Sequence, residues 1–123
     1  MSDSARETAT RLDPKWDERG LIQAVAVDAA SGAVLMVAHM DPAALAATLA
    51  TGEAHYWSRS RQEVWHKGGT SGNVQRVREV TIDCDQDAVV LRVEPAGPAC
   101  HTGAPTCFYR VVEADGALVR TRP

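Results

Sequence analysis

Short apolar-rich segments, each about the length of a β-strand, recur along the chain. Residues 21–28 and 33–40 are two such segments, and residues 29–32, with the sequence Ala-Ala-Ser-Gly, separate them. Small residues of this kind allow the chain to reverse between two strands. We therefore expect residues 21–40 to form a β-hairpin.

A different pattern follows this hairpin and predicts one short helix. Asp41 is a typical N-cap residue, and Pro42 is favoured at the first helical position. Leu45 and Leu49 are four residues apart and therefore lie on one face of the helix. Gly52 is a typical C-terminal stop. We expect an Ala-rich helix that begins after Asp41 and ends before Gly52.

Strand-like segments return after the helix, and glycines and prolines separate them. They comprise residues 54–60, 64–66, 73–84, 89–94, 107–113 and 117–120. Many short strands and one clear short helix predict an α+β domain made mostly of antiparallel β-sheet. No repeat, low-complexity tract or linker divides the sequence. We therefore expect a mobile N-terminal tail at residues 1–15 and a single domain at residues 16–123.

Composition limits the classes of protein that remain. A chain of 123 residues with 45% apolar residues can build one compact core. Its net charge of -3 argues against general nucleic-acid binding, so an anionic ligand needs a local basic patch. The longest apolar runs are far shorter than the roughly 20 residues of a membrane span. The N-terminal residues lack the apolar core of a secretory signal. These features predict a cytoplasmic protein with no membrane partner.

The segment Asp-Cys-Asp-Gln-Asp at residues 83–87 carries the densest chemical signal. If it is extended, its side chains alternate, and Asp83, Asp85 and Asp87 share one face while Cys84 lies on the other. Three close carboxylates repel one another and offer the hard oxygen ligands that suit Mg2+. The alternative is a solvated acidic turn after a strand.

Three cysteines, Cys84, Cys100 and Cys107, cannot all pair as disulfides within one chain, so metal ligation or plain burial remains. Cys100 and Cys107 flank a loop with glycine and proline that can fold both sulfurs onto one ion. Three thiolates without a fourth protein ligand would leave zinc an open position for a bound water, as in catalytic sites. His101, beside a cysteine, is the candidate catalytic base for this water. The alternative is three buried cysteines that act as small apolar residues.

A third cluster combines basic, aromatic and glycine residues. The sequence His-Tyr-Trp-Ser-Arg-Ser-Arg at residues 55–61 precedes Trp-His-Lys-Gly-Gly-Thr-Ser-Gly at residues 65–72. Arginine and lysine bind phosphate oxygens, glycine lets backbone N–H groups approach them, and aromatic rings stack on bases. The predicted substrate-binding residues are Trp57, Ser58, Arg59, Arg61, Lys67, Gly69, Thr70 and Ser71. The alternative is a basic, solvated hairpin with aromatic core residues.

Together these segments resemble the phosphoribosyl-AMP cyclohydrolase family, whose members open the purine ring of phosphoribosyl-AMP in histidine biosynthesis. The resemblance rests on residues 20–22, 34–36, 52–61, 65–72, 83–87, 100–103 and 107–109. Gln23 and His39 depart from it, because they stand where an apolar and an aromatic residue are expected. Neither position touches a metal motif.

The resemblance implies a zinc ion and a magnesium ion, bound in a homodimer whose subunits are intertwined. Zinc is expected at Cys84, Cys100 and Cys107, with Cys84 donated by the partner subunit. Mg2+ is expected at Asp83, Asp85 and Asp87. The implied reaction is attack of a zinc-bound hydroxide on C6 of 1-(5-phosphoribosyl)-AMP. This breaks the N1–C6 bond and gives phosphoribosyl-formimino-AICAR-phosphate.

Two other functions share part of this chemistry. A zinc-dependent nucleobase deaminase would need His-x-Glu and Pro-Cys-x-x-Cys motifs, and neither occurs in the sequence. A non-enzymatic, zinc-stabilised nucleotide-binding module would need a fourth zinc ligand, such as His101 or His66, and should unfold without metal.

Overall fold

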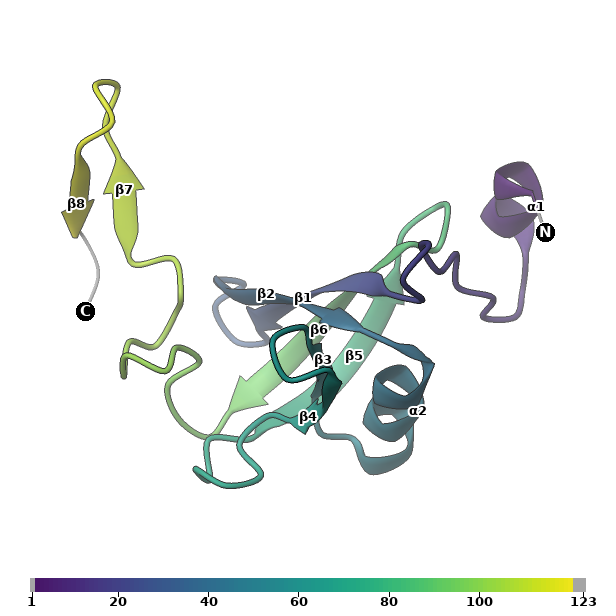
Figure 1. Ribbon diagram of the computed structural model, residues 1–123, viewed down its shortest axis with the longest axis horizontal. Helices are drawn as coiled ribbons and strands as arrows, with labels where there is room; N and C mark the ends of the chain where they lie inside the picture. Colours follow the sequence, from purple (N-terminus) through teal and green to yellow (C-terminus); the bar gives the residue numbers. More distant parts are fainter. Residues whose placement is uncertain (1, 121–123) are drawn as a thin grey trace.

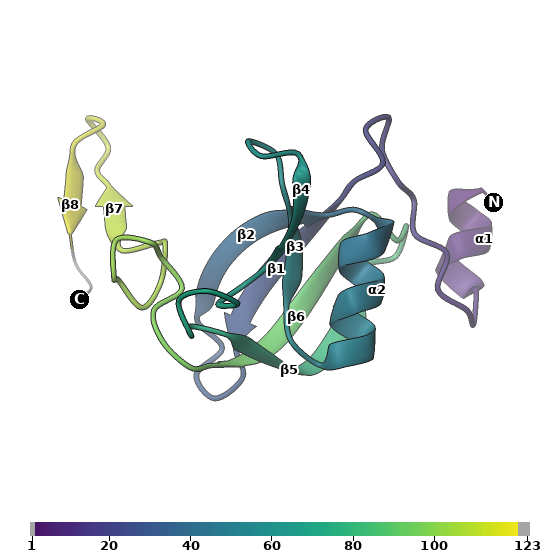
Figure 2. The ribbon, with the colours of Figure 1, turned by 60° about the horizontal axis from the view of Figure 1, so that its bottom comes forward.

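A computed structural model describes residues 2–120, which form two helices and eight strands (Figure 1). The elements are α1 (Asp3–Thr8), β1 (Ile22–Asp28), β2 (Val34–Met40), α2 (Pro42–Thr51), β3 (His55–Ser58), β4 (Glu63–His66), β5 (Gln75–Ile82), β6 (Ala88–Pro95), β7 (Arg110–Val112) and β8 (Leu118–Arg120). Strands β1 to β6 form a curled sheet in the order β4-β3-β2-β1-β6-β5 (Figure 2). Among these described strands, β1 and β6 are parallel, and the other neighbours are antiparallel. The predicted α+β class with mostly antiparallel sheet is confirmed, while the homodimer stays a prediction.

The predicted hairpin is present as β1 and β2. One carboxylate oxygen of Asp28 accepts hydrogen bonds from the backbone N–H groups of Ala30 and Ser31, at 2.8 and 3.1 Å. Gly32 follows with a φ of 77°, a left-handed conformation that glycine adopts without steric cost. These local interactions reverse the chain, and β2 then returns along β1.

Helix α2 confirms the predicted helix and both of its caps. The Asp41 side chain accepts a hydrogen bond from the first turn at 2.8 Å, and Gly52 ends the helix with a φ of 74°. The buried face consists of Ala44, Leu45 and Thr48. Leu49 is 53% exposed because it is turned about 40° from Leu45 around the helix axis, away from the sheet. In the described part of the chain, neither helix has the length and apolar character needed to cross a lipid bilayer.

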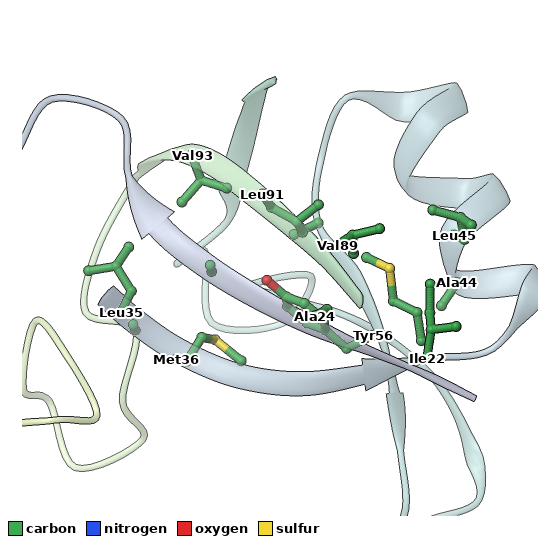
Figure 3. Close-up of a cluster of buried hydrophobic side chains, with 14 residues drawn as sticks. Ile22, Ala24, Leu35, Met36, Ala44, Leu45, Tyr56, Val89, Leu91 and Val93 are labelled. Carbon is green, nitrogen blue, oxygen red and sulfur yellow. The ribbon is translucent and has the colours of Figure 1, made fainter. Parts of the chain in front are cut away.

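The hydrophobic core lies between α2 and one face of the six-stranded sheet (Figure 3). Its fully buried side chains include Ile22, Ala24, Met40, Tyr56, Val89, Leu91 and Val93. Inside it, the Tyr56 hydroxyl donates to Oε1 of Gln75 at 2.6 Å, and Nε2 of Gln75 donates to Sδ of Met36 at 3.3 Å. This chain of hydrogen bonds ties β3, β5 and β2 together and satisfies the polar groups that the core buries.

The N-terminal segment contains a helix that the sequence pattern does not predict. Helix α1 follows Ser2, whose Oγ accepts a hydrogen bond from the Ala5 N–H at 3.2 Å. Further along, the backbone N–H groups of Asp13 and Lys15 both donate to Gln86, in the turn between β5 and β6. The segment therefore lies against that turn, and its predicted mobility stays a prediction.

Strands β7 and β8 form a hairpin that projects away from the main sheet (Figures 1 and 2). The hairpin exposes the apolar side chains of Val111, Val112, Leu118 and Val119, and Phe108, just before β7, is exposed as well. Val112 is 70% exposed. A two-stranded hairpin is marginally stable by itself in water. Such hairpins are usually stabilised by packing their apolar residues on another surface.

Candidate functional site

A cavity of about 650 Å³ lies between the loop that follows β4 and the loop that follows β6. Its walls are formed by Met36, Arg61, Trp65, Lys67, Gly68, Thr70, Ser71, Asn73, Pro98, Ala99, Cys100, His101, Gly103 and Cys107. The cavity thus brings together two of the predicted zinc ligands, the predicted base and half of the predicted substrate-binding residues.

The loop after β4 is held in a tight conformation that requires glycine. The backbone N–H of Lys67 donates to the Ala54 carbonyl at 3.1 Å, and that of Gly72 donates to the Gly68 carbonyl at 2.8 Å. Gly68 has a φ of 81°, and a Cβ atom there would lie 2.2 Å from the backbone nitrogen of Val74. Since only glycine avoids this overlap, the loop can bring its backbone close to a ligand in the cavity.

Backbone hydrogen bonds place the two cysteines of the loop after β6. The Cys107 N–H donates to the Leu35 carbonyl at 2.8 Å, which fastens the end of the loop to β2. The Cys100 N–H donates to the Ala104 carbonyl at 3.2 Å, which closes the loop on itself. As predicted from the glycine and proline between them, the two cysteines meet at one cavity.

The two thiols have different affinities for their protons. The Thr102 hydroxyl donates to Sγ of Cys100 at 3.0 Å and lowers the pKa of Cys100. Burial raises the pKa of Cys107 to about 11, and the nearby negative charge of Cys100 acts in the same direction. The Cys100 thiol therefore loses its proton more easily than the Cys107 thiol. Zinc, a cation that favours thiolate ligands, fits this donor pair.

Lys67 brings a buried positive charge to the same cavity. It is 6% exposed, and its Nζ donates to the Pro98 carbonyl at 3.5 Å and lies 5.8 Å from the centre of the Trp65 ring. Burial lowers the pKa of Lys67, and the charges of Cys107 and Cys100 oppose this change. Such a buried ammonium group is well suited to bind an anionic ligand.

Cys84 lies far from the other two cysteines of its own chain. It is exposed in the turn before β6, whereas Cys100 and Cys107 belong to the loop after β6 (Figure 1). The eight residues of β6 span about 25 Å at the usual rise of a strand. Cys84 is not among the residues that line the cavity.

The predicted acidic cluster exists, but its backbone differs from the extended segment considered for it. Residues 83–87 form a turn, in which Gln86 has a left-handed φ of 61°. Carboxylate oxygens of Asp83, Asp85 and Asp87 nevertheless lie within 4.8 Å of one another. Turn formation, and not alternation along a strand, therefore brings the three carboxylates together.

Crowding among these carboxylates alters their proton affinities. Burial alone would raise the pKa of Asp83, but hydrogen bonds from Asp87 and from the Ala88 N–H outweigh it and lower that pKa. The side-chain hydrogen bond with Asp83 raises the pKa of Asp87 to about 6, and burial and Asp85 act in the same direction. A divalent cation with oxygen ligands, such as Mg2+, would relieve this repulsion.

The predicted substrate-binding residues divide between two places. Arg61, Lys67, Thr70 and Ser71 line the cavity with the cysteines. Trp57 and Arg59 line a separate cavity of about 370 Å³, together with Arg19, Leu21 and Gln62. Ser58 and Gly69 line neither cavity. The Ser58 Oγ accepts a hydrogen bond from the Arg61 N–H at 3.3 Å, and the Gly69 N–H donates to the His66 carbonyl at 3.0 Å.

Two histidines and several residues that the sequence did not single out remain to be placed relative to the cavity. His101 is exposed and lines the cavity, in a position open to ligands. His66 instead holds Glu53 through Nε2 and Oε1 at 2.7 Å, so this nitrogen is already occupied. Sequence reasoning did not place Met36 or Asn73 at the site. Met36 gives no chemical signal, while Asn73 directly follows the glycine-rich run and so offered a weak one.

Comparison with known proteins identifies the family to which this chain is related. A family model described as phosphoribosyl-AMP cyclohydrolase matches residues 36–109. A phosphoribosyl-AMP cyclohydrolase of Rhizorhabdus wittichii is 60% identical over 120 residues, 97% of each chain. That of Sphingopyxis alaskensis is 59% identical over 116 residues, 94% of this chain and 92% of its own. That of Erythrobacter litoralis is 57% identical over 122 residues, 99% of this chain and 97% of its own.

These matches define the chain as an enzyme of the hydrolase class. It belongs to the phosphoribosyl-AMP cyclohydrolase family. The resemblance expected from the sequence motifs is thereby confirmed.

Proposed function

We propose that this protein hydrolyses the N1–C6 bond of the purine ring of 1-(5-phosphoribosyl)-AMP in histidine biosynthesis. The product is phosphoribosyl-formimino-AICAR-phosphate. The observation that carries this proposal is one cavity with three contributions. Cys100 and Cys107 line it, together with Lys67 of the glycine-rich loop after β4 and Arg61 of the turn before β4. This cavity combines a place for a metal that activates water with groups that bind the phosphates of a nucleotide.

We propose that zinc is held by Cys100 and Cys107 of one chain and by Cys84 of a second copy. The two thiols share a cavity, whereas β6 separates them from Cys84 of the same chain. Because Cys84 of the same chain lies at the other end of β6, the third thiolate would come from Cys84 of a partner subunit. Zinc bound by three thiolates would acidify a water molecule in its open position and so supply the nucleophile for C6.

The projecting hairpin supports a homodimer. Strands β7 and β8 follow Cys107 directly in the chain and expose a row of apolar side chains. If this hairpin packs on a second copy, it buries those side chains and brings the Cys107 region to the interface. This arrangement corresponds to the predicted intertwined dimer with zinc sites shared between subunits.

The chain's own groups have separate tasks in the reaction. Arg61, Lys67 and the backbone N–H groups of Gly68, Thr70 and Ser71 would bind phosphate oxygens. The Trp65 ring, which lines the cavity, offers a surface on which the purine can stack. His101, which lines the same cavity as Cys100, would accept a proton from the attacking water or return one to the departing ring nitrogen.

We further propose that Asp83, Asp85 and Asp87 hold Mg2+. Their oxygens converge within 4.8 Å, and three carboxylates suit a hard divalent cation. Cys84 lies within this acidic turn, so in the proposed dimer the turn would lie beside the zinc site of the other chain. Mg2+ bound by the turn would then be close to the phosphates of the substrate.

Turnover of phosphoribosyl-AMP tests the proposed function. Zinc-loaded protein with Mg2+ should convert this nucleotide to the ring-opened product, observed as a change in ultraviolet absorbance. Removal of zinc with a chelator should stop turnover, and returning zinc should restore it. Binding of the nucleotide without turnover would instead favour the zinc-stabilised binding module. In that case zinc removal should unfold the protein, which circular dichroism would detect.

Replacing Arg61 by Ala should weaken substrate binding. Loss of one charged hydrogen bond costs about 1.5 to 3 kcal/mol, which equals a roughly 10- to 100-fold rise in KM. The effect should fall on KM and leave kcat nearly unchanged if the contact is the same in the ground and transition states. Steady-state kinetics measure both values.

Arg92→Ala is the matched control for Arg61→Ala, because Arg92 is an exposed arginine that binds the Ala29 carbonyl outside the cavity. It should leave KM unchanged. Equal KM values for wild type and Arg61→Ala would mean that this arginine belongs to a solvated basic hairpin.

A further inference from the structure

Gln86 lies in the middle of the acidic turn but points into the protein. It is 4% exposed, and it binds the N-terminal segment through three separate groups. Its Oε1 accepts from the Asp13 N–H at 2.7 Å, its Nε2 donates to the Arg6 carbonyl at 3.3 Å, and its own carbonyl accepts from the Lys15 N–H at 2.7 Å. The turn and the segment thus form one hydrogen-bonded unit, although more than seventy residues separate them in sequence.

The conformation of Gln86 also determines how the three carboxylates are arranged. Its left-handed φ of 61° is unusual for a residue with a side chain. Its N–H donates to the Asp83 carbonyl at 3.1 Å, and one carboxylate oxygen of Asp83 accepts from the Asp87 and Ala88 N–H groups at 3.0 and 3.2 Å. With Gln86 buried in this turn, carboxylate oxygens of Asp83, Asp85 and Asp87 lie within 4.8 Å of one another.

The N-terminal segment also places a positive charge near the carboxylates. Nζ of Lys15 lies 2.8 Å from a carboxylate oxygen of Asp3, and this hydrogen bond raises the pKa of Lys15. The negative charges of Asp85 and Asp87 raise the pKa of Lys15 further, by smaller amounts. A positive charge in this place opposes the binding of a metal cation.

We propose that Gln86 is a positioning residue: by binding residues 6–15 of its own chain, it holds Asp83, Asp85 and Asp87 in the arrangement that binds a divalent cation. The N-terminal segment is then a working part of the cation site. This inference rests on the proposed function, because the cation site itself is part of that proposal.

The test measures cation binding directly, with Mn2+ as the probe and electron paramagnetic resonance as the readout. The zinc-loaded, full-length protein is titrated, so that activity plays no part in the result. Gln86→Gly removes the side chain but accepts the left-handed backbone without strain. It should weaken Mn2+ binding by about 10-fold or more, the scale seen when a group that orients metal ligands is lost.

Whether Gln86→Gly weakens or strengthens Mn2+ binding distinguishes a positioning role for Gln86 from an effect of the Lys15 charge alone. If Gln86→Gly merely released Lys15 from the carboxylates, a positive charge would leave and Mn2+ would bind more tightly. Lys15→Gln removes that charge while its backbone N–H remains, and it should bind Mn2+ at least as tightly as wild type. Mn2+ binding by Gln86→Gly that equals or exceeds that of wild type would overturn the role of Gln86.

A second pair of variants leaves the acidic turn untouched. Asp13→Pro removes the N–H that Gln86 binds, and Asp13→Ala keeps it while removing the same carboxylate. Pro14 already restricts residue 13 to extended backbone, a region that includes polyproline conformation, so both variants favour the same kind of backbone there. Asp13→Pro should bind Mn2+ more weakly than Asp13→Ala. Equal affinities for these two variants would count against the N-terminal segment as part of the site.

Asp85→Asn separates failure of this inference from failure of the proposed cation site. It removes one ligand and should abolish Mn2+ binding while zinc content stays unchanged. If wild type itself does not bind Mn2+, the cation site and the role of Gln86 both fall. If wild type binds Mn2+, Asp85→Asn does not, and Gln86→Gly matches wild type, only the role of Gln86 falls.

Discussion

Cys107→Ser is expected to lose its zinc and nearly all of its turnover. The serine hydroxyl resembles the thiol in size but does not supply a thiolate, and the remaining cysteines cannot complete the zinc site. The loss of activity should exceed the roughly 10- to 100-fold cost of removing a group that only orients a metal ligand. Elemental analysis for zinc and the rate of phosphoribosyl-AMP turnover provide the two measurements.

The fold of this variant should remain intact, which makes the result interpretable. Cys107 contributes to the fold through its N–H, which donates to the Leu35 carbonyl at 2.8 Å, and this group is unchanged in Cys107→Ser. Circular dichroism should therefore match that of wild type. A Cys107→Ser protein with full activity and one zinc per chain would remove Cys107 from the proposed site.

Mixing Cys84→Ser with Cys100→Ser should restore activity that neither variant has alone. In a dimer with shared sites, a mixed pair combines Cys84 of the Cys100→Ser chain with Cys100 and Cys107 of the Cys84→Ser chain. One of its two sites is then complete. Random pairing gives mixed dimers half of the time, so activity should recover to roughly a quarter of that of wild type.

The control for this experiment is a mixture of Cys100→Ser with Cys107→Ser. Both changes fall on the same side of the shared site, so every site in a mixed dimer lacks one ligand, and no activity should return. Mass spectrometry verifies that subunits have exchanged. Heterodimers of Cys84→Ser and Cys100→Ser that stay inactive would contradict zinc sites shared between subunits.

Elements that depend on local signals could be predicted from the sequence. Asp41 and Gly52 mark the ends of α2, and Gly32 marks the turn of the first hairpin, because capping and turn formation involve residues close in sequence. Such local signals do not predict the order of the strands in the sheet. The pairing of β1 with β6 joins Val25 to Val90, and nothing local to either residue indicates it.

The candidate site was predicted as a set of residues but not as an arrangement. The basic cluster is continuous in sequence, yet the turn between β3 and β4 sends Arg59 and Arg61 to different cavities. Residues 83–87 form a turn in which Gln86 has a left-handed φ and bonds to a distant segment, and sequence alternation cannot reveal this. The sequence predicts the thiol pair because Cys100 and Cys107 lie near each other along one loop.

The parallel pairing of β1 with β6 has a consequence for the order in which the protein folds. Strands β1 and β2 emerge early from the ribosome and can pair at once through their short turn. The other edge of β1 stays open until β6 has been made, because Gln23 pairs with Ala88 and Asp28 with Val93. During synthesis this unpaired edge is exposed to other chains, a known risk for aggregation. Pairing so distant in sequence also slows folding, since a long loop must close before the central contact forms.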